Sequence, residues 1–222
     1  MIFSIDDVLR EEELEAILSG CDRGEFVDGK LTAGWHAKLV KENTQLAKNS
    51  DLAKDLQSIL KKALKRHPLF KSAVLPRQIH SIIFSRYQTG MSYGTHVDNA
   101  LMGQEKFFRS DISFTLFLSD PETYEGGELV TELSEGDRVY KLPKNSVILY
   151  PSSTLHRVEP VKSGNRLVAV GWVQSLVRAP HKREVLFDLD TARRALFAQF
   201  GKTTEFDLIS KSYANLLRQW AE

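Results

Sequence analysis

The stretch SDISFTLFLS, residues 110–119, decides the fold class. It is a short apolar run bounded by polar residues, and it is too short to be a typical buried helix. Five further runs of the same kind are IHSIIFSRY (79–87), GELVTEL (127–133), RVYKL (138–142), NSVILYP (145–151) and NRLVAVGWVQSLV (165–177). Short strands at near-regular spacing predict an all-β sandwich or barrel. A βαβ arrangement is excluded because no helical period lies between the strands.

Helical patterns flank this β-rich region on both sides. Residues 10–19 and 51–66 are amphipathic, with Ser50 as N-cap of the second helix and Pro68 as its end. Residues 26–46 carry glycines between short apolar runs and predict a hairpin. Residues 183–200 and 204–221 again show helical periodicity. We therefore predict a mainly β protein with flanking helices (α+β), its β core spanning about 73–178 of a domain at 1–179. A C-terminal helical extension at 180–222 docks on that core.

Composition narrows the class of protein. The 222 residues contain 30 Lys and Arg against 29 Asp and Glu, so no basic surface for nucleic acid is expected. The first residues lack a basic segment followed by an apolar run, and no apolar run approaches the length of a membrane span. Cys21 is the single cysteine, which fits a reducing compartment. We expect a cytoplasmic protein with no nucleic-acid or membrane partner.

The run YQTGMSYGTHVD, residues 87–98, places His96 two residues before Asp98. On a strand these side chains share a face and can bind one ion. The pair is also common by chance, and it is equally compatible with polar residues on the outer face of a strand. Two histidines and one carboxylate form the facial triad of Fe(II) sites, so a third ligand is needed. The other histidines are His36, His67, His80, His156 and His181. His156 is favoured because it follows a strong strand and a turn.

Arg166 opens the strand NRLVAVGWVQ ten residues after His156. Its neighbours on one strand face are Val168, Val170 and Trp172, which would place the guanidinium inside the β structure. A buried charge requires an anion, and a guanidinium suits bidentate pairing with a carboxylate. Two alternatives remain: an internal salt bridge, or an exposed position at the turn SGN.

Taken together, these residues resemble the Fe(II)- and 2-oxoglutarate-dependent dioxygenases. The run Y-x-x-G-x-x-Y-x-x-H-x-D at 87–98 is similar to the prolyl-4-hydroxylase branch, and RSDISFTLFLSDPETYEGGELV (109–130), KLPKNSVILYPSSTLHRVEPV (141–161) and LFDLDTA (186–192) resemble bacterial PKHD-type hydroxylases. The resemblance implies a double-stranded β-helix (jelly roll) core. It also implies these roles: Fe(II) binding by His96, Asp98 and His156, binding of the distal carboxylate of 2-oxoglutarate by Arg166, a cosubstrate contact from Tyr87, and a place near the substrate for Tyr93.

The same resemblance implies hydroxylation of an unactivated C–H bond with O2, and ascorbate binding as a reductant. The substrate would be a prolyl or other protein residue, or a small molecule, with 99–108 as a substrate loop. Two alternatives stay open: a cupin-like iron enzyme that does not use 2-oxoglutarate, and a non-catalytic jelly-roll binding module. The apolar face of 204–221 either packs on its own core or forms a homodimer contact.

Overall fold

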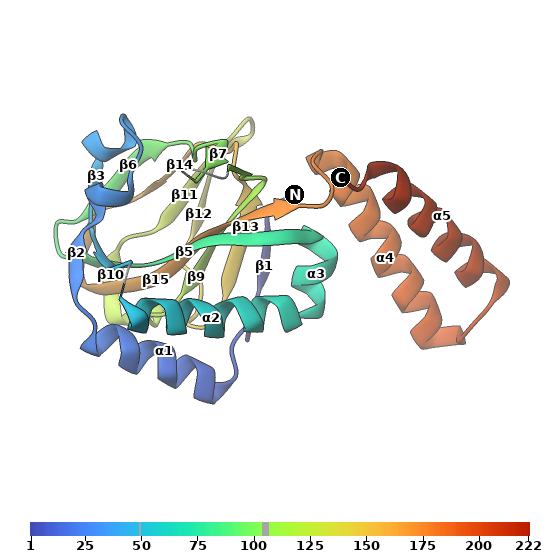
Figure 1. The fold of residues 1–222 in the computed structure, drawn as a ribbon, viewed down its shortest axis with the longest axis horizontal. Coiled ribbons are helices and arrows are strands. Elements are labelled where there is room, and N and C mark those ends of the chain that lie inside the picture. Colours follow the sequence, from blue (N-terminus) through green and yellow to red (C-terminus); the bar gives the residue numbers. More distant parts are fainter. Residues whose placement is uncertain (49, 104–106) are drawn as a thin grey trace.

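Two antiparallel sheets form the body of the protein, as the computed structural model shows for residues 1–48, 50–103 and 107–222 (Figure 1). The larger sheet has the order β1 (Phe3–Ile5), β13 (Val147–Pro151), β9 (Ile112–Phe117), β15 (Val161–Ser175), β5 (Pro76–Gln88), β4 (Thr44–Leu46), β2 (Phe26–Asp28), with β10 (Tyr124–Gly126) paired to β15. The smaller sheet has the order β12 (Gly136–Tyr140), β11 (Leu129–Leu133), β14 (His156–Val158), β6 (Ser92–His96), β3 (Lys41–Glu42). The short strands β7 (Leu101–Met102) and β8 (Phe108–Arg109) pair separately. The jelly-roll core with flanking helices is confirmed.

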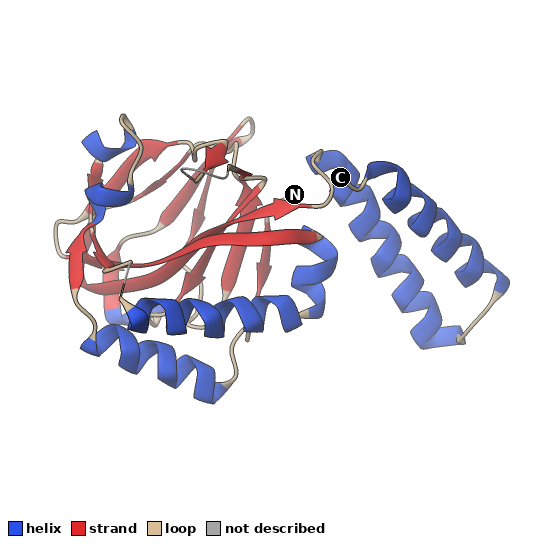
Figure 2. Ribbon diagram, viewed as in Figure 1, coloured by secondary structure: helices blue, strands red, loops and turns tan. Residues whose placement is uncertain are grey.

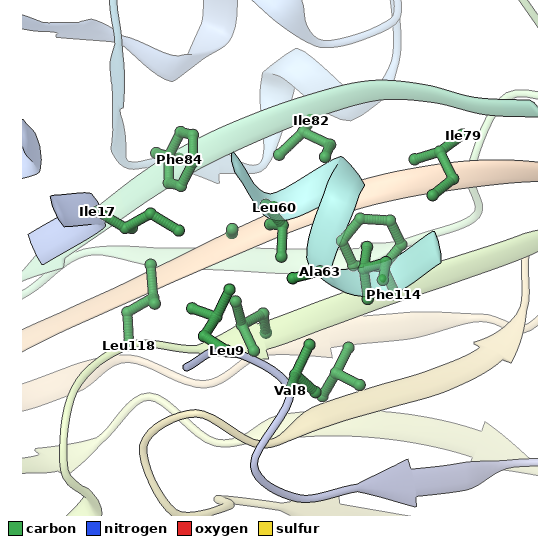
Figure 3. Close-up of a cluster of buried hydrophobic side chains, with 14 of the residues drawn as sticks. Val8, Leu9, Ile17, Leu60, Ala63, Ile79, Ile82, Phe84, Phe114 and Leu118 are labelled. Carbon is green, nitrogen blue, oxygen red and sulfur yellow. The ribbon is translucent and has the colours of Figure 1, made fainter. Parts of the chain in front are cut away.

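Strand β9 shows why the central strands appear in the sequence as nearly continuous apolar runs. All six of its residues are buried, because each face of the larger sheet is covered. Ile112, Phe114 and Leu116 face a cluster shared with the helices, part of which is drawn in Figure 3. Phe117 faces a second cluster that contains Leu129 of the smaller sheet. The space between the two sheets is therefore the interior of the jelly roll.

Three N-terminal helices lie along the outer face of the larger sheet: α1 (Glu11–Arg23), α2 (Asp51–Arg66) and α3 (Pro68–Val74). Ser50 caps α2 as predicted, since its hydroxyl accepts a hydrogen bond of 3.1 Å from the amide of Ala53. Pro68 does follow the end of α2, but it also begins α3, which the sequence analysis missed. Proline suits that first helical position because the amide it lacks would be unpaired there.

The predicted hairpin at 26–46 exists only at its two ends, where β2 pairs with β4. Between them the chain forms two short 3-10 helices, η1 (Gly29–Thr32) and η2 (Ala37–Leu39), and the strand β3. A third, η3 (Pro121–Thr123), precedes β10. The excursion at 29–43 matters for function because it crosses from the larger sheet to the edge of the smaller one.

The C-terminal helices α4 (Pro180–Phe200) and α5 (Thr204–Trp220) form an antiparallel hairpin that extends away from the sheets (Figure 2). Among the described residues its base contacts the core: Leu186 packs with Leu75 and Val177, and the amide of Glu222 donates to the carbonyl of Leu176. The extension therefore contacts the rest of the chain at its base, while the distal parts of α4 and α5 pack against each other. Within the described residues, no helix has the length and apolar character needed to cross a membrane.

Candidate metal centre

Three predicted ligands meet between the sheets. His96 is the last residue of β6, and His156 is the first of β14 and pairs directly opposite it. Asp98 lies past the end of β6, so the expected alternation along one strand does not apply to it. One donor atom from each of the three residues lies within 4.8 Å of the others, and His156 Nε2 is 3.9 Å from Asp98 Oδ2. Two imidazoles and one carboxylate at this spacing fit a single divalent ion.

Both imidazoles are held in one orientation by backbone carbonyls two residues before them, Gly94 in β6 and Thr154 in the turn before β14. His96 Nδ1 lies 2.9 Å from the carbonyl of Gly94, and His156 Nδ1 lies 3.0 Å from that of Thr154. A carbonyl only accepts, so each Nδ1 carries the proton and each Nε2 keeps its lone pair for a metal. Burial, assisted by the neighbouring His156, lowers the pKa of His96 to about 4. His96 is therefore a neutral ligand at neutral pH.

The carboxylate of Asp98 is oriented by two serines that the sequence analysis missed. Ser113 Oγ donates a hydrogen bond of 2.5 Å to Asp98 Oδ2, and it lies 2.8 Å from Ser152 Oγ. Such outer contacts fix ligand geometry in metal sites. One signal was available in the sequence. Ser113 and Thr115 are polar residues two apart in an otherwise apolar strand, so they share the face opposite Phe114.

Aromatic rings pack against both histidines. The Tyr93 ring stacks on His96 at 3.6 Å between centroids, and the Tyr150 ring meets His156 edge-on at 5.0 Å. Burial raises the pKa of both phenols above its ordinary value, so both hydroxyls stay protonated. Tyr93 thus lies beside the candidate metal position, where the sequence analysis expected a residue near the substrate.

Arg166 is buried without a counter-ion. Its side chain is 1% exposed, and none of its three guanidinium nitrogens has a hydrogen-bond partner among the described residues. The guanidinium carbon lies 5.0 Å from the ring centroid of Tyr87 and 5.6 Å from that of Phe117. The structure therefore supports neither of the other interpretations, an internal salt bridge or an exposed position. An unpaired buried cation is costly, so the pocket is suited to an anionic ligand.

Gly127 makes room for the arginine. It has a φ of +67°, and a Cβ at this position would lie 2.9 Å from Arg166 Cδ. A residue with a side chain would strain the backbone here and press on the aliphatic part of the arginine.

One cavity of about 1040 Å³ connects these groups. Its lining includes the three candidate ligands, Tyr87 and Arg166, together with apolar side chains from both sheets. The remaining histidines do not join the cluster in the described part of the chain. His80 also lines the cavity, where its ring contacts Phe108. The arrangement can hold a divalent metal ion and a carboxylate ligand at the same time.

Comparisons with known proteins identify the family. Residues 82–174 match a family model described as the 2OG-Fe(II) oxygenase superfamily, and residues 181–222 match the PKHD-type hydroxylase C-terminal domain. Over its full length the chain is 65% identical to a PKHD-type hydroxylase of Acaryochloris marina and 64% identical to one of Gloeothece citriformis, and both relatives are covered completely. The chain belongs to the PKHD-type hydroxylases. It is an Fe(II)- and 2-oxoglutarate-dependent dioxygenase, which decides against a cupin-like enzyme and a non-catalytic module.

Solved structures support the fold of this PKHD-type hydroxylase. A Pseudomonas putida prolyl-4-hydroxylase is 17% identical with a TM-score of 0.54, covering 78% of this chain and 92% of that one. A Trichoplax adhaerens prolyl hydroxylase, solved with a peptide fragment of hypoxia inducible factor, is 14% identical with a TM-score of 0.56. That alignment covers 83% of this chain and 86% of that one. The family implies Fe(II), 2-oxoglutarate and O2, and the His-Asp-His cluster fits the metal.

Proposed function

We propose that His96, Asp98 and His156 bind the Fe(II), that Arg166 binds the distal carboxylate of 2-oxoglutarate, and that the enzyme hydroxylates an unactivated C–H bond of its substrate. The observation that carries these assignments is the unpaired buried guanidinium of Arg166 in the same cavity as the three ligands. A dicarboxylate would supply the missing anion at one end and a second carboxylate for the metal at the other.

The iron, when bound with 2-oxoglutarate and O2, supplies the oxidative chemistry: decarboxylation of the cosubstrate to succinate and insertion of one oxygen atom into a C–H bond. The protein's part is to bind and orient. His96 and His156 present fixed Nε2 lone pairs, and Ser113 holds the carboxylate of Asp98. Arg166 fixes one end of the cosubstrate, with the neighbouring Tyr87 as a further contact.

Apolar side chains form part of the cavity wall around these groups. Leu129, Val158 and Val170 line it from both sheets, and each presents an apolar side chain. A low-dielectric wall strengthens the pairing between Arg166 and a carboxylate. It also protects a strong oxidant from bulk water.

The substrate is either a protein residue, prolyl or other, or a small molecule, and we propose that it enters over Tyr93. The predicted substrate loop at 99–108 falls partly on residues 104–106, which lie outside the described residues. Leu101, Met102 and Gly103 of the same segment line the cavity, which supports a substrate contact there. We also propose ascorbate as reductant, from the resemblance of the chain to prolyl hydroxylases, and a cytoplasmic location, from its single cysteine.

The decisive experiment needs no substrate. Fe(II) and then 2-oxoglutarate are added anaerobically to metal-free protein, and the visible charge-transfer band of the chelate is recorded for wild type, His96→Ala and Arg166→Met. Arg138→Met is the matched control because its guanidinium is on the surface. We expect the band in wild type and the control, no band in His96→Ala, and a much higher 2-oxoglutarate requirement in Arg166→Met. Bound iron without a band in wild type would refute 2-oxoglutarate binding, and no bound iron would refute the ligand assignment.

A further inference from the structure

The cavity has a polar wall that the proposed roles do not use. Lys41 Nζ donates a hydrogen bond of 3.2 Å to Thr32 Oγ1, which in turn donates one of 2.6 Å to Gln45 Oε1. Gln45 Nε2 then lies 3.4 Å from Ser85 Oγ. These four side chains come from η1, β3, β4 and β5, and all of them line the cavity. The excursion of the chain at 29–43 brings this wall together.

Lys41 is a buried cation without an ion-pair partner. It is 5% exposed, and no carboxylate among the described residues lies within 4.0 Å of its nitrogen. Its ammonium has three donors, and Thr32 accounts for one of them. Burial lowers the pKa of Lys41 to about 8, so the group remains largely charged at neutral pH. Because an unpaired buried charge is costly, a charged and incompletely bonded ammonium in a cavity is suited to an anionic ligand.

Lys41 stands close to the metal position but does not belong to it. Its nitrogen is 5.1 Å from the ring centroid of Tyr93, which stacks on His96. Of the carboxylates that raise the pKa of Lys41 against the effect of burial, Asp98 has the larger influence and Asp28 the smaller. Once a divalent ion binds to Asp98, that negative charge is offset, and the ion adds a positive charge nearby. The loaded enzyme therefore stabilises the charge of Lys41 less than the metal-free protein does, and a carboxylate bound beside the ammonium would restore that stabilisation.

Other unsatisfied groups line the same cavity. The Asn43 amide and the indole nitrogen of Trp172 have no hydrogen bond of normal geometry within the described residues, although the Asn43 amide does interact with the Tyr87 hydroxyl. Asn43 is 5% exposed, lies two residues from Lys41 and lines the same cavity. A ligand bound at Lys41 has further polar partners available.

We propose that Lys41 binds a carboxylate of the substrate, and hence that this enzyme hydroxylates a carboxylate-bearing compound or an acidic segment. This inference rests on the proposed function. There, one carboxylate of 2-oxoglutarate pairs with Arg166 and the other binds the metal, so neither end of the cosubstrate is left for Lys41. Tyr93, the residue expected near the substrate, is the ring that Lys41 contacts.

The test uses probes with and without the charge. Full-length protein is loaded anaerobically with Fe(II) and saturating 2-oxoglutarate, and its melting temperature is followed with N-acetylalanine or with the neutral N-acetylalaninamide at constant ionic strength. We expect the acid to bind wild type at least about tenfold more tightly than the amide. Lys41→Met should lose this preference, and Lys41→Arg should keep it. Lys38→Met is the matched control, because Lys38 is exposed on the same segment.

A second arm identifies the source of the carboxylate. A blocked tripeptide with a central glutamate is compared with its glutamine counterpart. A larger acid preference for the tripeptide indicates a side-chain carboxylate of a polypeptide, and a larger one for N-acetylalanine indicates a small acid.

Three results would overturn the inference: equal binding of acid and amide by wild type, a preference that survives in Lys41→Met, or a raised 2-oxoglutarate requirement in Lys41→Met. The last would assign Lys41 to the cosubstrate. Misfolding is not expected to obscure the outcome, because methionine keeps the length of the stem and removes a buried charge. The charge-transfer band separates the two proposals, since its absence in wild type is a failure of the proposed function alone.

Discussion

Replacing Arg166 with methionine should have opposite effects on the free and the ligand-bound protein. In the free protein the guanidinium is buried without a partner among the described residues. Methionine keeps most of the aliphatic stem beside Gly127 and removes the charge. Exchanging buried charged groups for apolar ones of similar volume is commonly neutral or stabilising, by up to about 4 kcal/mol. We therefore expect Arg166→Met to melt at or above the temperature of wild type when 2-oxoglutarate is absent.

Binding should change in the other direction. Removing one partner of a buried, hydrogen-bonded charge pair costs about 2–5 kcal/mol. At about 1.4 kcal/mol for each factor of ten, the affinity for 2-oxoglutarate should fall by a factor between about 30 and a few thousand. The aromatic rings of Tyr87 and Phe117 exclude water from the guanidinium, which favours the upper part of this range.

Thermal unfolding with anaerobic Fe(II) measures both effects. At a 2-oxoglutarate concentration of about 100 times the wild-type Kd, wild type gains about 2.7 kcal/mol, whereas a variant weakened a hundredfold gains about 0.4 kcal/mol. Arg138→Met should behave as wild type in both conditions. The reasoning is refuted if Arg166→Met unfolds at a clearly lower temperature without ligand and gains as much as wild type with it. That result would make Arg166 a structural residue.

Three further predictions concern the site and its scaffold. Ser113→Ala should weaken Fe(II) affinity about 10- to 100-fold in a chelator competition, because the carboxylate it holds becomes free to rotate. Gly171→Ala should lower stability by about 1–3 kcal/mol, since its Cβ would lie 2.5 Å from a core phenylalanine. Gly90→Ala should lower stability by only roughly 1 kcal/mol, because its Cβ would meet no atom within 4 Å and the only cost is that of a positive φ in alanine. In urea unfolding at pH 7, Glu13→Gln should lower the free energy of unfolding by about 0.5–1 kcal/mol because it loses the pair with Arg66. Glu12→Gln should change it very little, since Glu12 is exposed and lies 3.9 Å from Arg10.

The pH dependence of the Glu13 effect follows from its partner. Hydrogen bonds from Arg66, both 2.8 Å long, lower the pKa of Glu13 from 4.5 to about 2. The stabilisation is therefore complete above pH 4.5 and is lost as the pH falls towards 2. The difference between wild type and Glu13→Gln should shrink over that window. A difference that stays constant with pH would contradict the Glu13–Arg66 pairing. Unchanged iron affinity in Ser113→Ala would contradict the role of Ser113, and equal melting of the two glycine variants would contradict the packing argument.

The central strands were predictable because burial on both faces leaves a continuous apolar run in the sequence. The runs at 110–119 and 165–177 became β9 and β15, which lie at the middle of the larger sheet. The edge strand β3 was not predictable, since its two residues, Lys41 and Glu42, are both charged. It forms because β6 offers an open edge to pair with, and that information lies elsewhere in the chain.

The candidate ligands could be proposed from sequence because their residue types and order are distinctive. The residues that orient these ligands could not be proposed in this way. His36 lies in the predicted hairpin at 26–46, yet it occupies the N-cap position of η2 without a side-chain capping bond, and it does not join the ligand cluster of the described residues. Ser152 reaches the site from the turn after β13, far in sequence from Asp98. The environment of Lys41 likewise depends on four elements that meet only in the folded chain.

The two Nδ1 hydrogen bonds to Gly94 and Thr154 have a consequence for metal selection. Each imidazole is oriented by the carbonyl of the residue two positions before it, so the two histidine ligands are already in place before any ion binds. Because the two nitrogens and one oxygen are already in position, the site does not select between ions through a folding step that depends on the ion. Affinity should then follow the general order of divalent metals, with nickel, copper and zinc ahead of iron. The identity of the ion in the living cell is thus determined by which metals the cell makes available, and excess zinc should act as an inhibitor.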